Sequence, residues 1–191
     1  YLNLVMGMIE EYGMTADDRT LMFSSPSFDV SLSDIGVPLA AGASICPVSL
    51  ATLSAPNRLV DLIAELSITV VDLTPTYLRL LWGAALPSVR ILVTGGEAPF
   101  AAEVATYAKN HRYYNAYGPT ENTITSSLGL LSPTEQGRFN CGKPLPNTLI
   151  EIRNPNAQRV PPGVTGEVWL AQKAQQLGLI DGIGHIKQIL K

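Results

Sequence analysis

The sequence is poor in charge, in cysteine and in histidine. Only 15% of its 191 residues are charged, 46% are hydrophobic, and the formal net charge is -3. Such a composition predicts a folded, well-buried protein, and without a basic patch interleaved with aromatics it argues against a nucleic-acid partner. Cys46, Cys141, His111 and His185 are isolated in the sequence, so no zinc site or disulfide framework is predicted. We therefore expect a reducing, cytoplasmic setting.

No stretch of the sequence has the pattern of a membrane-spanning helix. The longest uncharged run, residues 35–57, contains Pro38, Pro47 and Pro56, which break helices. No signal peptide is visible, and we expect no membrane partner. The chain begins at Tyr1 and enters a helix-like pattern at once, which suggests a piece of a longer polypeptide.

Strand-like and helix-like segments alternate as far as Asn115. Strands that alternate with helices at this spacing form a parallel sheet covered by helices on both faces, so we predict an α/β fold. Strands are predicted near residues 20–24, 43–48, 68–73, 89–93 and 112–115, and helices near 2–12, 27–39, 57–66, 74–82 and 98–109.

The helical periodicity of the sequence stops at about Thr123. Residues 149–153 and 166–170 read as strands separated by a proline-rich turn, which predicts a short antiparallel β segment from a second, β-barrel subdomain. The last residues carry apolar side chains at roughly helical spacing interrupted by glycines, so a covering helix, a linker and a docking or membrane peptide all remain open. We expect an α/β subdomain over residues 1–142, a partial β-barrel subdomain over 143–171, and a tail of unclear origin over 172–191.

Polar residues follow several of the predicted strands. Asp29 comes after the first strand, Asp72 ends the third, residues 95–97 follow the fourth and residues 115–121 follow the fifth. Ligands of open parallel sheets bind beyond the carboxyl ends of the strands. We therefore expect these residues to meet at one edge of the sheet.

The most informative stretch is residues 113–125, Tyr-Tyr-Asn-Ala-Tyr-Gly-Pro-Thr-Glu-Asn-Thr-Ile-Thr. Its Gly-Pro turn gathers an aromatic ring, a hydroxyl and a carboxylate in Tyr117, Thr120 and Glu121. The ring can cover a nucleotide base, the hydroxyl can donate to a phosphate, and the carboxylate can hold Mg²⁺, which prefers oxygen ligands. An ordinary turn with a solvated glutamate has the same local pattern, so both interpretations stay open at this point.

Residues 115–121, Asn-Ala-Tyr-Gly-Pro-Thr-Glu, resemble the Asn-x-Tyr-Gly-Pro-Thr-Glu core motif of the amino-acid adenylation domains of nonribosomal peptide synthetases, in the adenylate-forming ligase superfamily. Residues 28–31, Phe-Asp-Val-Ser, resemble the family's Phe-Asp-x-Ser motif, and residues 94–97, Thr-Gly-Gly-Glu, its glycine-rich turn. Residues 161–170 resemble the start of the next core motif, so the motifs stand in family order. The family's phosphate loop, ribose-binding Asp, hinge motif and C-terminal lysine domain do not appear in this sequence.

The resemblance implies a flavodoxin-like subdomain of an enzyme that uses ATP and Mg²⁺ to activate an amino-acid substrate. The product, an aminoacyl adenylate, would then be loaded on the phosphopantetheine of a peptidyl carrier protein. It implies catalytic roles for Thr120 and Glu121, with Glu121 as the Mg²⁺ ligand; we expect little or no turnover by this chain alone. The nucleotide-binding positions would be Gly95, Gly96, Glu97, Asn115, Ala116, Tyr117 and Thr120, and the amino-acid-binding positions Asp29, Val30, Ser33, Asp72, Val93, Gly95, Ala116, Ile124 and Thr125.

Two aspartates carry the specificity prediction. By the resemblance, Asp29 holds the substrate's α-amino group, and an ammonium would supply the partner that an Asp among apolar residues needs; a helix cap is the alternative. Asp72 stands in an apolar strand, where carboxylates are disfavoured, and by the resemblance it lines the side-chain pocket. A roomy pocket with one negative end predicts a side chain such as that of ornithine, lysine or arginine. Capping the helix that starts near Pro75 is the alternative role for Asp72.

Two other functions stay open on the sequence. One is an acyl- or aryl-coenzyme A ligase of the same superfamily. Asp29 and the complete Tyr-Gly-Pro-Thr-Glu of residues 117–121 argue against it, because an acid without an α-amine needs no such carboxylate. A non-catalytic binding scaffold would agree with the absent motifs.

Overall fold

The computed structural model describes residues 1–81, 83–135 and 139–150. The chain divides into two units, Tyr1–Thr148 and Leu149–Lys191, and the helices and strands described below all lie in the first. The strand predicted at 166–170, the motif at 161–170, the tail at 172–191 and most of the strand predicted at 149–153 lie outside the described residues.

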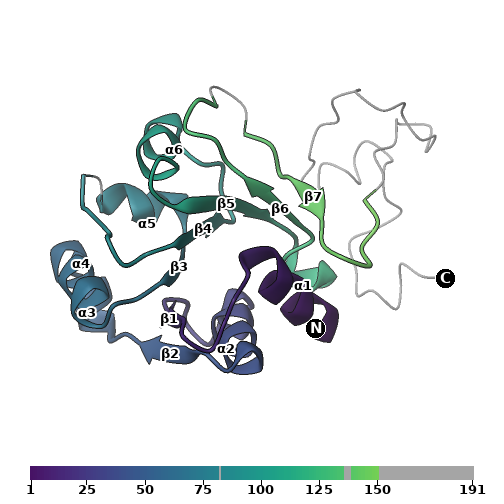
Figure 1. Ribbon diagram of the computed structural model, residues 1–191, viewed down its shortest axis with the longest axis horizontal. Coiled ribbons are helices and arrows are strands. Elements are labelled where there is room, and N and C mark those ends of the chain that lie inside the picture. The colour runs from purple at the N-terminus through teal and green to yellow at the C-terminus, as the bar shows by residue number, and fades with distance from the viewer. Residues whose placement is uncertain (82, 136–138, 151–191) are drawn as a thin grey trace. The chain divides into compact units, whose positions relative to one another are not determined.

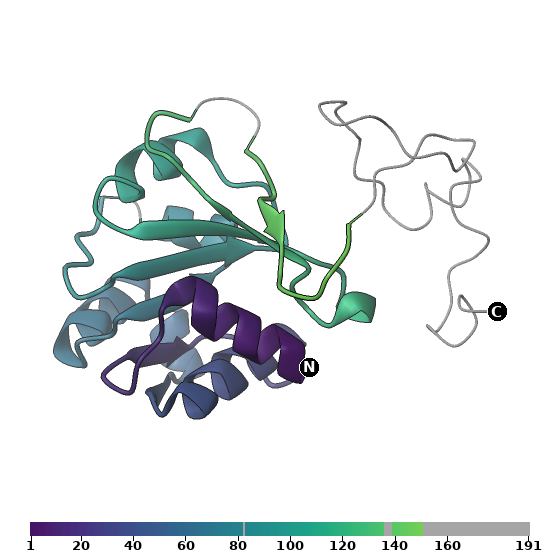
Figure 2. The ribbon, with the colours of Figure 1, turned by 45° about the vertical axis from the view of Figure 1, so that its right-hand side comes forward.

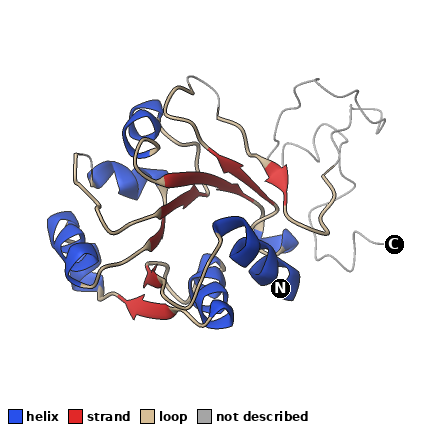
Figure 3. Ribbon diagram, viewed as in Figure 1, coloured by secondary structure: helices blue, strands red, loops and turns tan. Residues whose placement is uncertain are grey.

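The first unit is built on a mixed sheet with the strand order β2-β1-β3-β4-β5-β6-β7. The first five strands are parallel, in the 2-1-3-4-5 order of flavodoxin-like folds, so the predicted fold class is confirmed (Figure 1 and Figure 3). The antiparallel strands β6 and β7 extend the sheet beyond β5; neither was predicted. The strands are β1 (Arg19–Met22), β2 (Ser44–Pro47), β3 (Val70–Leu73), β4 (Ile91–Gly95), β5 (Arg112–Tyr117), β6 (Ser127–Leu130) and β7 (Lys143–Pro144).

Helices cover both faces of the sheet, as predicted (Figure 1 and Figure 2). Alternate strand residues point to opposite faces, so the strands contribute side chains to two hydrophobic cores, one on each face of the sheet. Val71 and Leu92 pack with α4, α5 and α6, whereas Val70 and Val93 pack with α1 and α2. The helices are α1 (Leu2–Tyr12), α2 (Val30–Ala41), α3 (Leu50–Leu53), α4 (Pro56–Glu65), α5 (Pro75–Leu80) and α6 (Ala101–Tyr107), and a 3-10 turn, η1, spans Thr120–Asn122.

Local sequence explains several helix ends. Gly13 ends α1 with a left-handed φ of 58°, a conformation that costs glycine little. Thr74 caps α5, because its hydroxyl accepts a hydrogen bond from the backbone N–H of Tyr77 at 3.2 Å, and Pro75 follows in the first turn. The short helix α3 was not predicted.

An ion pair between half-buried Arg90 and buried Asp18 fixes the amino-terminal ends of the strands. Arg90 Nε donates to Asp18 Oδ1 at 2.7 Å, and Thr69 Oγ1 donates to the same oxygen at 2.7 Å. Arg90 also donates to the carbonyl of Tyr12 at the end of α1. Burial acts to raise the pKa of Asp18, but these hydrogen bonds and one from the Thr15 N–H outweigh it and lower that pKa to about 2. This edge of the sheet is held by structural contacts, which leaves the opposite edge for ligands.

Candidate active site

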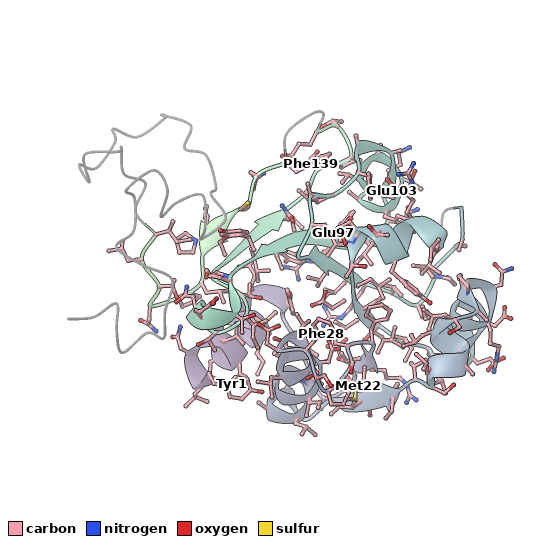
Figure 4. All side chains as sticks on the ribbon, turned by 180° about the vertical axis from the view of Figure 1, so that it is seen from behind. Tyr1, Met22, Phe28, Glu97, Glu103 and Phe139 are labelled. Atoms are coloured by element: carbon pink, nitrogen blue, oxygen red, sulfur yellow. The ribbon has the colours of Figure 1, made fainter. Side chains whose placement is uncertain are left out.

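A cleft of about 530 Å³ opens beyond the carboxyl ends of β1, β3, β4 and β5. Ligands of parallel sheets bind at this position. The cleft includes the point between β1 and β3 at which the strand order reverses. Phe28, which lines the cleft, is labelled near the middle of Figure 4. Nine of the predicted site residues line it: Asp29, Val30, Asp72, Gly95, Gly96, Ala116, Thr120, Ile124 and Thr125.

The other predicted site residues lie near the cleft but do not line it. Ser33 and Val93 line a smaller inner cavity, and Asn115 is buried and donates to the Asn140 carbonyl at 3.0 Å. Glu97, labelled in Figure 4, accepts a hydrogen bond from Thr76 Oγ1. The remaining two, Tyr117 and Glu121, are exposed, Tyr117 at the end of β5 and Glu121 in η1.

The sheet separates the predicted amino-acid positions from part of the nucleotide positions. Val93, Ala116 and Ile124 belong to the core beneath α1 and α2, and by strand alternation Asp72 shares that face with Val70. Asn115 and Tyr117 alternate with Ala116 and therefore point to the other face, where α5 and α6 lie. The two sets come together only at the carboxyl edge, beside the cleft.

The Gly-Pro turn folds back tightly onto the chain that follows it. The N–H of Ser126 donates to the Tyr117 carbonyl at 2.8 Å, and β6 then pairs antiparallel with β5. A Cβ on Gly118 would lie 2.3 Å from the Ile124 carbonyl oxygen, so only glycine fits there. Thr123 and Ile124 have φ of 61° and 70°, a strained conformation for β-branched residues. Strain in a wall of the cleft is the kind of feature that functional sites retain.

Asp29 occupies the N-cap position of α2, but its side chain makes no capping hydrogen bond to the described residues. The helix-capping alternative for Asp29 is therefore wrong. The side chain is half-buried and lines the cleft instead, where its carboxylate is available to a cationic ligand.

Asp72 does not cap α5 either, because Thr74 does so. Its carboxylate lies with that of Asp34, which α2 brings to the same face of the sheet. Burial, and then the charge of Asp34, raises the pKa of Asp72 to about 8. Burial also raises the pKa of Asp34 to about 6, although the 2.9 Å hydrogen bond that Asp34 accepts from the Ser24 N–H acts to lower this pKa. The carboxylates of Asp34 and Asp72 therefore line the same small cavity, whereas the sequence analysis predicted only Asp72 as a pocket residue.

Several lining residues were missed by the sequence reasoning. Phe23 and Ser24 after β1, and Thr74 after β3, follow strands whose ends were already expected to form the site, so that rule alone would have included them. Asp34 had a weaker signal, an acidic residue within an apolar helical pattern. The cleft residues absent from the prediction are Phe23, Ser24, Ser25, Phe28, Leu73, Thr74 and Gly118.

A flavodoxin-like sheet that presents this motif turn and an aspartate-lined cleft at its carboxyl edge has the arrangement expected of an adenylate-forming enzyme. Residues 1–179 match the family model described as "AMP-binding enzyme", and the chain belongs to that family. It is 33% identical to a linear gramicidin synthase of Brevibacillus parabrevis over 93% of the chain and 4% of that protein. It is 35% identical to tyrocidine synthase 1 of the same organism over 88% of the chain and 16% of that protein.

Solved structures agree with this family. The crystal structure of IdnL1 matches with a TM-score of 0.75 and 26% identity, over 86% of the chain and 36% of that protein. The four-domain nonribosomal peptide synthetase AB3403, bound to AMP and glycine, matches with a TM-score of 0.76 and 26% identity, over 86% of the chain and 13% of that protein. The resemblance to adenylation domains of nonribosomal peptide synthetases is thus confirmed, and the chain spans only a small part of these relatives.

Two further observations concern the described residues alone. None of their helices combines the length and hydrophobicity needed to cross a bilayer. They hold no cluster of three or more histidine, cysteine, aspartate or glutamate side chains suited to a metal ion. Mg²⁺ in nucleotide sites usually takes one or two carboxylates together with phosphate oxygens, so a single exposed carboxylate such as that of Glu121 is compatible with it.

Proposed function

We propose that this chain is the amino-acid- and adenine-binding part of an adenylation domain in nonribosomal peptide synthesis. In the reaction, an amino-acid carboxylate attacks the α-phosphorus of ATP to give an aminoacyl adenylate and pyrophosphate. The aminoacyl group then forms a thioester on the phosphopantetheine of a peptidyl carrier protein. The observation that supports the proposal is that amino-acid positions on one face of the sheet, and the nucleotide positions Asn115 and Tyr117 on the other, meet at the carboxyl edge beside the cleft.

The amino acid would be held by its ammonium and its side chain. Asp29 pairs with the α-amino group and so directs the carboxylate of the substrate towards the nucleotide. Val30, Val93 and Ala116 form the apolar wall of the side-chain pocket, since all three pack into the same core. Held in this way, the two reactants meet without the entropic cost of a bimolecular encounter.

The nucleotide would lie on the other side of the cleft. The ring of Tyr117 is 37% exposed and free to stack on adenine. The bond from Asn115 Nδ2 to the Asn140 carbonyl orients the Asn115 amide, so that its oxygen can accept from the adenine amino group. Gly96 has open space where a Cβ would be, which lets a base approach the backbone.

Charge stabilisation would come from the turn after β5. Thr120 lines the cleft and donates to the α-phosphate, and Glu121 in the same 3-10 turn ligates Mg²⁺. When bound, Mg²⁺ neutralises charge on the phosphates of ATP. We propose residues 1–142 as the α/β subdomain and 143–171 as part of a β-barrel subdomain, whose first residues form β7 and pair with β6 at the edge of the α/β sheet. We expect the chain alone to turn over little or not at all.

The substrate would carry a basic side chain, because the pocket end contains Asp72 and Asp34. Isothermal calorimetry with the 191-residue chain, ATP and Mg²⁺ tests this. We expect L-ornithine or L-lysine to bind, and Asp29→Ala to weaken binding by about tenfold or more because a charge-assisted contact is lost. Asp17→Asn, an exposed change, serves as the control.

A ligand that differs from ornithine only in lacking the α-amine distinguishes the proposed amino-acid-activating function from that of a coenzyme A ligase. The compound 5-aminopentanoate is ornithine without its α-amine, so it cannot pair with Asp29. Equal affinity for 5-aminopentanoate and L-ornithine would show that Asp29 does not recognise an α-amine and would favour the acid-activating enzyme. Failure of every amino acid to bind would contradict the proposed function.

A further inference from the structure

A small inner cavity lies behind the cleft, between the sheet and helices α1 and α2. Residues of five elements line it: Tyr12 of α1, Thr20 of β1, Asp34 of α2, Asp72 of β3 and Val93 of β4 are among them. Asp72 also lines the cleft, so it stands where the two spaces adjoin. The cavity measures about 20 Å³, which is room for one group of the size of a water molecule.

The cavity contains hydroxyl groups without hydrogen-bond partners. Within the described part of the chain, no partner exists for Tyr12 Oη, Thr20 Oγ1 or Ser33 Oγ. Their residues are only 3%, 4% and 5% exposed, so water outside the protein cannot satisfy them. Burying a hydroxyl without a partner destabilises a fold, and three in one cavity point to a ligand group that satisfies them.

The cavity also contains two acidic side chains with no positive counterpart. In the free chain burial raises the pKa of both, and a cation bound between them would favour their ionised forms. The carboxylates of Asp34 and Asp72 come from opposite walls, and no lysine, arginine or histidine of the described residues lines the space. An ionised carboxylate offers only acceptors, and a hydroxyl can either donate or accept. The missing group should therefore be a donor, positively charged and compact.

A primary ammonium meets all three requirements. It has three N–H donors and no acceptor, it is about the size of a water molecule, and it is the compact cation among basic side chains. A planar guanidinium has five N–H donors in a fixed fork and needs more space than this cavity has.

We propose that this cavity binds the terminal ammonium of the substrate's side chain, with Asp34, Thr20 and Tyr12 as specificity-determining residues in addition to Asp72 and Ser33. The inference rests on the proposed function and narrows it, from basic side chains in general to those of ornithine or lysine. The apolar part of the side chain would pass Val93, which lines the same cavity.

Two variants test the assignment by calorimetry with L-ornithine, L-lysine and L-arginine as probes, and by thermal unfolding of the free chain. Thr20→Val keeps the shape and removes a partnerless hydroxyl. We expect it to raise the unfolding temperature of the free chain yet weaken binding of L-ornithine or L-lysine about tenfold. A residue with a purely structural role would not shift stability and affinity in opposite directions.

Asp34→Asn is the second variant, with an expected loss of affinity of about tenfold or more because the charge-assisted bond is removed. Glu103→Gln is the matched control, since Glu103 is also a buried carboxylate but lies on α6, on the other face of the sheet. We expect Glu103→Gln to leave the affinity for the three probes unchanged. If Asp34→Asn does not fold, Thr20→Val still decides the question.

The outcomes separate this inference from the proposed function. If a basic amino acid binds and Asp72→Asn weakens it, but Thr20→Val and Asp34→Asn do not, the ammonium site is wrong while the proposed function stands. Tighter binding of L-arginine than of both L-ornithine and L-lysine would also overturn the ammonium site. If none of the three amino acids binds, both the site and the basic-substrate proposal fail.

Discussion

Asp72→Asn should stabilise the free chain, and by an amount that grows with pH. The pKa of Asp72 is about 8 in the folded chain because of burial and the charge of Asp34, against an ordinary value of 3.8. Between these two values the unfolded chain has lost a proton that the folded chain retains. The free energy of unfolding therefore falls as the pH rises from about 4 to about 8.

The size of the effect follows from the same two values. Each pH unit between them lowers the free energy of unfolding by about 1.4 kcal/mol, so at pH 7 the free energy of unfolding is lower by on the order of 4 kcal/mol. Solvent reaches part of Asp72, and the titration of Asp72 is coupled to that of Asp34. We therefore expect about half of this destabilisation, ~2 kcal/mol. Asparagine carries no charge, so Asp72→Asn should recover ~2 kcal/mol at pH 7, ~3 kcal/mol at about pH 8 and almost none at about pH 4.

Urea unfolding followed by far-UV circular dichroism, at about pH 4 and about pH 8, measures the difference. Asp17→Asn, an exposed aspartate, controls for the general effect of removing a charge. The other titratable groups that face Asp72 are Asp34 on α2 and Tyr12 on α1. Because Asp34 is coupled to Asp72, Asp34→Asn should also stabilise the chain, and the double variant should gain less than the sum of the two. An equal gain for Asp72→Asn at both pH values would refute the reasoning.

Two further predictions concern the scaffold. Asp18→Asn should lower the free energy of unfolding by about 2 kcal/mol at pH 7, because Arg90 loses its charged partner while solvent, which reaches the 37% exposed Arg90 side chain, screens part of the loss. In the wild type, the lowered pKa of Asp18 means that this contribution is present above about pH 4 and lost as the pH falls towards 2. Urea titrations across that range check it, and an unchanged stability in Asp18→Asn would contradict it. Gly118→Ala should cost about 2 kcal/mol or more, because the new Cβ would meet the Ile124 carbonyl. Gly83→Ala, where φ is +83° but the space is open, should cost only about 1 kcal/mol, so equal losses at the two glycines would argue against the clash.

The parallel part of the sheet was predictable because its signals are local. The buried strands stand out as apolar runs between helical patterns, and the cap and proline at the start of α5 agree with them. Strand β6 escaped prediction, since it follows two left-handed, non-glycine residues, Thr123 and Ile124. No local preference predicts such a conformation; the pairing of β6 with β5 imposes it.

The sequence by itself determined which residues share a face of each strand and which follow the strand ends. Period-two alternation puts Thr20 and Asp72 on the sides they occupy, and the motif turn after β5 can be read directly from its residues. Only the tertiary structure decided that α1 and α2 cover the face bearing Asp72, and therefore that Tyr12 and Asp34 lie beside it. The physical reason is that strand periodicity is a property of the local backbone, whereas helix placement depends on burying apolar side chains against strands distant in sequence.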